Sequence, residues 1–133
     1  MASSDNSSRQ NVVRDRIIVT VAAWIEILVG ISFLVAIGGQ SNALFGVAPE
    51  GVAVLFGRLA GVALIGLGLV CLPSKVTGAE PGAGRGLFIF NLVAAIFFVW
   101  VAVGTAFHGF MLWPVVMLHA VLTIALAPQV LRR

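Results

Sequence analysis

Four polar side chains interrupt long apolar stretches of the sequence, one in each stretch: Glu26, Arg58, Asn91 and His119. A charge held within hydrocarbon costs at least about 2.5–3.5 kcal/mol, so ionisable residues at such positions indicate a functional site by default. A carboxyl, a guanidinium, an amide and an imidazole can together bind a polar head group, and Glu26 can also exchange a proton. We therefore predict that these four residues form an intramembrane polar cluster and a candidate ligand-binding site.

The depth of each residue indicates which of them meet. Counted from the outer end of each apolar stretch, Glu26 lies about 16 Å deep, His119 about 12 Å and Arg58 about 9 Å. Asn91 lies about 24 Å deep, roughly two turns further in. This placement predicts a charge-assisted Glu26–Arg58 pair with His119 close by, and it predicts that Asn91 makes a separate hydrogen bond between helices.

Three roles for the Glu26–Arg58 pair remain open. The pair can fix the register of two helices, since buried ion pairs are better evidence for specificity than for net stability. It can instead line a site for a polar head group, or Glu26 can take part in proton coupling. His119 is either a packing residue or a hydrogen-bond donor to a carbonyl or quinone oxygen. No second His, Cys or Asp shares its helix face, so we expect no metal site.

The stretches that carry these residues are long enough to cross a bilayer. A spanning helix needs roughly 20 apolar residues. The chain has 133 residues, of which 60% are hydrophobic and 10% charged, whereas soluble domains are about a quarter charged. We predict an all-α, four-transmembrane-helix bundle over residues 17–131. Its spans are expected at about 17–37, 52–72, 87–107 and 111–131.

Basic residues lie on one side of the predicted spans. Cytoplasmic loops carry an excess of Lys and Arg, so the pattern predicts a multi-pass protein of a bacterial inner (cytoplasmic) membrane, with both termini cytoplasmic. The polar segment 1–16 is expected to be a disordered cytoplasmic N-terminus. No basic stripe indicates nucleic-acid binding. The basic residues are Arg9, Arg14 and Arg16 before the first span, Lys75 and Arg85 between the second and third, and Arg132 and Arg133 at the end.

Small residues predict where the helices approach closely. Ala53, Gly57 and Gly61 follow small-xxx-small spacing in the second span, which lets another backbone come near. Gly30, one turn beyond Glu26, is expected to leave room for Arg58. The segment 38–42 is expected to end the first span, and 42–51 to lie in the outer interface or act as a lid. The Gly-rich segment 78–86 is expected to be a loop.

No catalytic motif is present in the sequence. We find no G-x-S-x-G, H-E-x-x-H, P-loop or dinucleotide-binding fingerprint, and we assign no catalytic residue. Cys71 is the only cysteine, so it forms neither an intramolecular disulfide nor a metal site, and we expect it to be a small buried residue. We predict no tightly bound cofactor, although a quinone or lipid ligand remains open.

The first half of the chain resembles the DoxX-like family of small four-helix bacterial membrane proteins. The resemblance rests on Leu44, Phe45, Gly46 and Pro49 in an LFG-x-x-P segment. It continues in the second span through Arg58, Leu59 and Gly61, with Gly66 and Gly68 following, and Glu26 fits the first span of that group. The family's namesake is linked to a membrane thiosulfate:quinone oxidoreductase, so the resemblance implies a quinone or another lipid-soluble ligand.

A second resemblance gives a different functional class. Four short spans with one glutamate in the first are similar to small multidrug resistance exporters, which act as dimers. Their carboxylate must exchange a proton for a cationic substrate, and a guanidinium beside Glu26 would hold the carboxylate ionised and repel cations.

We therefore expect a non-enzymatic membrane protein that binds a quinone-like or amphipathic small molecule, or an accessory subunit of a membrane complex. Its partners would be the bilayer and either a second membrane protein or a second copy. The alternatives are a proton-coupled exporter using Glu26, and a membrane enzyme that acts on an isoprenoid-like substrate through Glu26 or His119.

Overall fold

The structure, a computed structural model, describes residues 2–73 and 81–131. Every regular element in these ranges is a helix, which confirms the all-α prediction. Some residues that the sequence analysis named lie outside the described residues. They are Lys75, Gly78 to Glu80, Arg132 and Arg133. The helices are α1 (Ala2–Val35), α2 (Ile37–Phe45), α3 (Val52–Cys71), α4 (Pro81–Gly104) and α5 (Leu112–Leu131).

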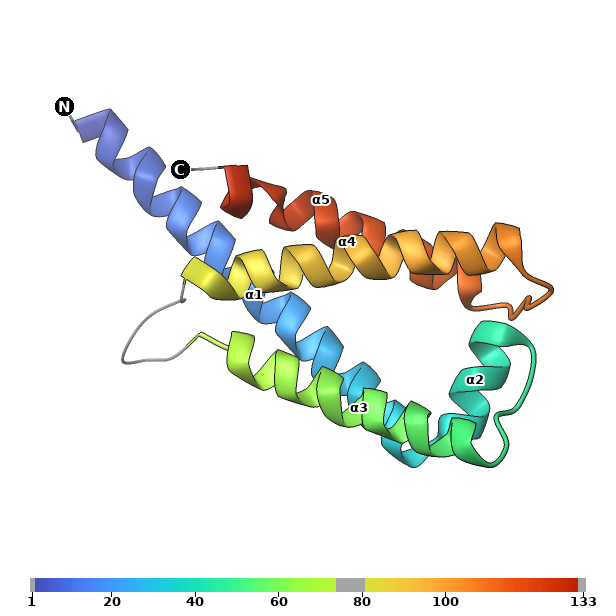
Figure 1. Cartoon of the computed structure of the whole chain (residues 1–133). Helices are drawn as coiled ribbons and strands as arrows, with labels where there is room; N and C mark the ends of the chain where they lie inside the picture. Colours follow the sequence, from blue (N-terminus) through green and yellow to red (C-terminus); the bar gives the residue numbers. More distant parts are fainter. Residues whose placement is uncertain (1, 74–80, 132–133) are drawn as a thin grey trace.

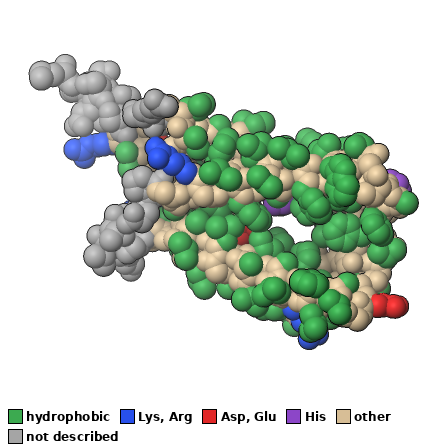
Figure 2. All heavy atoms as spheres, in the orientation of Figure 1, with side chains coloured by type: hydrophobic (Ala, Val, Ile, Leu, Met, Phe, Trp, Pro, Cys, Tyr) green, Lys and Arg blue, Asp and Glu red, His purple; other side chains and the backbone are tan. Residues whose placement is uncertain are grey.

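Four of these helices are long and apolar enough to cross a membrane, as the sequence predicted. The spanning segments are Arg9–Val35, Val52–Cys71, Gly82–Gly104 and Leu112–Leu131. Large apolar side chains cover their outward faces, as the space-filling view shows (Figure 2). Such an exposed apolar surface is stable in lipid and not in water. The chain is therefore a multi-pass integral membrane protein.

Two helices extend further toward the N-terminus than the sequence indicated. We expected disorder over residues 1–16, whereas α1 continues back to Ala2. Extending a helix that the apolar span has already nucleated adds residues without a second nucleation cost. Likewise α4 begins at Pro81, inside the predicted 78–86 loop. Proline suits the first turn of a helix because its missing N–H would have no partner there.

The spanning helices form two hairpins (Figure 1). In the first hairpin α1 packs along α3, with α2 in the turn between them, and in the second hairpin α4 packs along α5. Contacts between the two hairpins are much fewer. The start of α1 and the end of α5 lie at the same end of the bundle.

Glycines hold the first hairpin together. A Cβ atom at Gly30 of α1 would lie 2.6 Å from the carbonyl oxygen of Gly61 in α3, and a Cβ at Gly61 would lie 2.7 Å from the oxygen of Gly30. Further along, a Cβ at Gly68 would lie 2.6 Å from the oxygen of Ala23. At Gly61, the predicted small-residue face of α3 is therefore the face that packs against α1. Gly30 makes room for the α3 backbone and not, as we expected, for Arg58.

The turn of the first hairpin contains a helix where we predicted irregular structure. The chain breaks at Ala36 and then continues as α2 through Gly38 and Gly39. This short helix binds the α4–α5 turn through two backbone hydrogen bonds. Gly109 N–H donates to the Leu44 oxygen at 3.1 Å, and Met111 N–H donates to the Ala43 oxygen at 2.9 Å. The two hairpins are thereby joined at the α2 end of the bundle.

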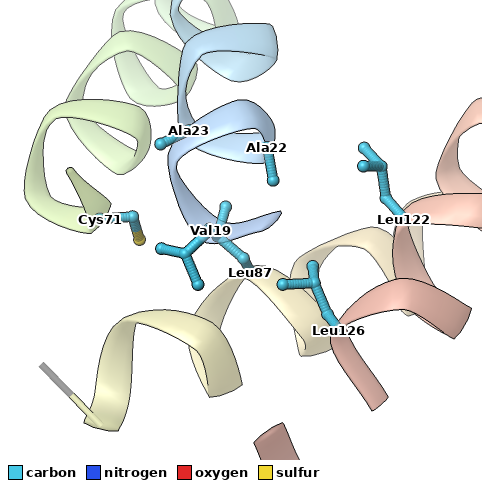
Figure 3. Packing of buried hydrophobic residues seen from close by; sticks show 7 residues of the cluster. All are labelled: Val19, Ala22, Ala23, Cys71, Leu87, Leu122 and Leu126. Carbon is cyan, nitrogen blue, oxygen red and sulfur yellow. The ribbon is translucent and has the colours of Figure 1, made fainter. Parts of the chain in front are cut away.

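A second junction between the hairpins is an apolar cluster nearer the chain termini (Figure 3). Leu87 of α4 and Leu126 of α5 are fully buried there against α1, and Cys71 of α3 is buried with them, as expected for a small apolar residue. The Cys71 thiol donates to the oxygen of Ala83 in α4, at 3.7 Å. The cluster consists of Val19, Ala22, Ala23, Cys71, Leu87, Leu122 and Leu126.

The close α1–α3 packing predicts that two glycines of the same helix respond differently to one added methyl group. Gly61→Ala should lower the free energy of unfolding by about 1–3 kcal/mol, because the methyl group forces the backbones apart. Gly66→Ala is the matched control, since nothing lies within 4 Å of its added Cβ, and it should be neutral or slightly stabilising. Unfolding of both variants in detergent, followed by circular dichroism, makes the comparison. Equal effects would contradict the packing described.

Candidate functional site

Asn91 lies at the centre of a polar cluster that links three helices. Its Nδ2 donates to the Leu87 oxygen at 2.9 Å and, at the longer distance of 3.5 Å, to Oε1 of Glu26 in α1. Its Oδ1 lies 2.8 Å from Nδ1 of His119 in α5. Asn91 is 0% and Glu26 1% exposed. Buried polar groups need such partners, because an unsatisfied one in hydrocarbon costs several kcal/mol.

The acceptor at Leu87 determines which way the Asn91 amide faces. A backbone carbonyl only accepts hydrogen bonds, so the atom facing it must be the amide nitrogen. The amide oxygen then faces His119 and accepts a hydrogen bond from Nδ1–H. The network therefore assigns the ring proton of His119 to Nδ1.

The imidazole of His119 is held between aromatic side chains of α4. It stacks on the ring of Phe98, with the centroids 5.6 Å apart and the planes 12° apart, and it meets the edge of Phe90 at 6.1 Å. One turn further along α5, Thr123 donates its hydroxyl to the backbone oxygen of His119 at 2.7 Å. The ring position is thus fixed by packing as well as by Asn91.

Arg58 does not join this cluster. Its side chain is exposed, on a face of α3 that also exposes Leu55, Leu59 and Val62. The described part of the chain contains an ion pair between Arg14 and Asp15 but none between Arg58 and Glu26. The predicted Glu26–Arg58 ion pair is therefore wrong. The partner of the Glu26 carboxyl is instead the side-chain amide of Asn91.

The depth estimate was wrong because it treated the outer ends of the four apolar stretches as level. The hydrogen bond from Asn91 to Glu26 places these two residues at the same level, although we had placed Asn91 two turns further in. Depth along the chain also carries no information on which way a side chain faces, and Arg58 faces outward.

An apolar cleft of about 510 Å³ lies between the first hairpin and α4, on the α2 side of the cluster. Five of its fifteen lining residues are aromatic, and Ser41, Glu50 and Thr105 are its polar members. Figure 2 shows a hollow between the two hairpins, with acidic and histidine side-chain atoms beside it. The aromatic lining residues are Phe33, Phe45, Phe97, Trp100 and Phe107.

The cleft and the polar cluster share a face of α1. Phe33 follows Glu26 by seven residues, which places both on one face of α1 about 10 Å apart along the axis. On α4, Phe97 lies six residues after Asn91, which is about 9 Å along the axis but on a different face of the helix. A polar cluster and an aromatic-lined cleft thus follow one another along the space between the hairpins. Sequence reasoning missed the cleft, because no local pattern distinguishes its phenylalanines from those that face lipid.

Nothing in the described ranges suits a metal ion, since no group of three or more His, Cys, Asp or Glu is close enough to hold one. No protein family, curated protein or solved structure matches this chain. The two family resemblances therefore stay predictions, and the function is argued from the geometry alone.

The cluster predicts energetic coupling between Asn91 and His119. Asn91→Leu keeps the branching at Cγ and His119→Phe keeps an aromatic ring, but each leaves a buried polar group without its partner. The double variant should lose less stability than the two losses summed, by about 0.5–1.5 kcal/mol. Unfolding free energies of all four proteins in mixed detergent measure this coupling.

Glu26 and Arg58 provide the matched control for this cycle. The effects of Glu26→Gln and Arg58→Gln should add, because the two side chains do not touch. Coupling between Glu26 and Arg58, or strict additivity between Asn91 and His119, would contradict the structure.

Proposed function

We propose that this protein binds an amphipathic, quinone-like small molecule within the bilayer. The head group would lie at the Glu26–Asn91–His119 cluster, and the apolar part would occupy the aromatic-lined cleft between the hairpins. The observation that carries this proposal is the cleft that follows the buried cluster along one face of α1, in the space between the hairpins. Ligand sites are typically apolar clefts with a few convergent polar groups.

The charges of the described residues are consistent with a location in a bacterial inner membrane with cytoplasmic termini. Arg14 and Arg16 lie in the first half of α1, and Arg85 lies near the start of α4. The starts of these helices belong to the same end of the bundle (Figure 1). Basic residues gathered at one end favour the cytoplasmic side for that end. The DoxX-like resemblance and a role as an accessory subunit remain compatible with ligand binding at this site.

A pair of space-filling variants tests the site. The protein in detergent is mixed with 4-dodecylphenol or with its methyl ether, 4-dodecylanisole, and the bound molecule is counted by native mass spectrometry. We expect one molecule per chain with at least one of the two probes. Ala53→Phe should abolish this binding, because Ala53 lines the cleft.

Ala63→Phe is the control for a bulky residue on the same helix, since Ala63 is exposed and outside the cleft lining. It should bind as the wild type does. If neither probe binds, or if both variants bind equally well, the proposed function is wrong.

A proton-coupled exporter is a second candidate, and one observation now favours it. The main objection was a guanidinium beside Glu26, and Arg58 lies elsewhere. Within residues 2–73 and 81–131, the Glu26 carboxyl has a single long hydrogen bond, to Asn91. Under this proposal, cells producing the protein resist cationic drugs, and Glu26→Gln abolishes resistance while the protein still accumulates. Resistance that survives in Glu26→Gln, or that the wild type never confers, would remove this candidate.

A further inference from the structure

The second ring nitrogen of His119 is the polar atom of the cluster best placed to meet a ligand. His119 is only partly buried, whereas Glu26 is 1% exposed and Asn91 is fully buried. Nδ1 is engaged with Asn91. In the described part of the chain, Nε2 has no hydrogen-bond partner. The atom is not fully buried either, since it is absent from the buried atoms that lack a partner.

The hydrogen bonds already made decide what Nε2 can offer. Because the Asn91 amide nitrogen faces the Leu87 oxygen, Asn91 Oδ1 must accept from His119 Nδ1–H. A neutral imidazole has one N–H, so its other nitrogen carries a lone pair and accepts. Nε2 of the neutral ring therefore binds a donor. This reverses the role we expected for His119, which was to donate to a quinone carbonyl.

We infer that the ligand of this site carries a hydroxyl group on its head, as a phenol, quinol or alcohol does, and donates it to Nε2 of His119. The inference rests on the proposed function and names its substrate class. A quinone carbonyl or an ether oxygen only accepts, so it would face the lone pair of Nε2 without a hydrogen bond. The stacked Phe98 and the edge of Phe90 hold the ring, so it cannot turn freely to present Nδ1–H instead.

The matched probes 4-dodecylphenol and 4-dodecylanisole test this inference, because they differ only in the hydroxyl proton that the methyl group replaces. Binding is titrated at about pH 8, above the ordinary histidine pKa of about 6.5, where a histidine ring is neutral. We expect the phenol to bind about tenfold more tightly than the ether, as for an interaction in which one buried acceptor is left unpaired. Equal binding, or tighter binding of the ether, would overturn the inference while leaving the proposed function in place.

His119→Asn separates hydrogen bonding from steric exclusion of the methyl group. An asparagine amide reaches the position of Nδ1 and can still donate to Asn91, but it has no atom at Nε2. The preference for the phenol should disappear in this variant, whereas a purely steric preference would persist and would overturn the assignment to His119. If neither probe binds the wild type saturably, the proposed function itself fails, which is a distinct result. Should His119→Asn not fold, equal binding of the two probes by the wild type would still overturn the inference.

Discussion

A bilayer interior offers no water, so each polar group that enters it must find a partner within the protein. Asn91 meets this requirement for three helices at once. Its amide donates to Leu87 and to Glu26 and accepts from His119, which ties α4 to α1 and to α5. An amide can do this because it carries donors and an acceptor on one rigid plane. A charged residue in the same place would leave either Glu26 or His119 without a complementary partner.

The two hairpins meet in few places, and this arrangement creates the site. Within the first hairpin, glycine contacts bring α1 and α3 together so closely that no side chain fits between them at Gly30 and Gly61. Besides the Asn91–Glu26 hydrogen bond, the hairpins meet in an apolar cluster at one level and through the backbone bonds of α2 at the other. The cleft lies between these junctions, next to the Asn91 cluster.

The sequence predicts the four spans well, because hydropathy and length alone determine them. It also identifies Glu26, Asn91 and His119 as residues that need partners. It does not determine which partners they find, since that depends on how far each helix rotates and tilts against its neighbours. Arg58 shows the difference: its type and depth suit Glu26, yet it faces outward on α3. The α2 helix escaped prediction because Gly38-Gly39 normally indicates a break in a helix.

The tautomer of His119 is the most direct test of the network around Asn91. Nitrogen chemical shifts of histidine-labelled protein in lipid, recorded by solid-state NMR at about pH 8, distinguish a protonated Nδ1 from a protonated Nε2. The chain has only two histidines, and His108 is exposed in the α4–α5 turn, so it gives the reference signal. The structure predicts that His119 is protonated at Nδ1 and that Asn91→Leu removes this preference. A His119 ring protonated at Nε2 in the wild type would contradict the account.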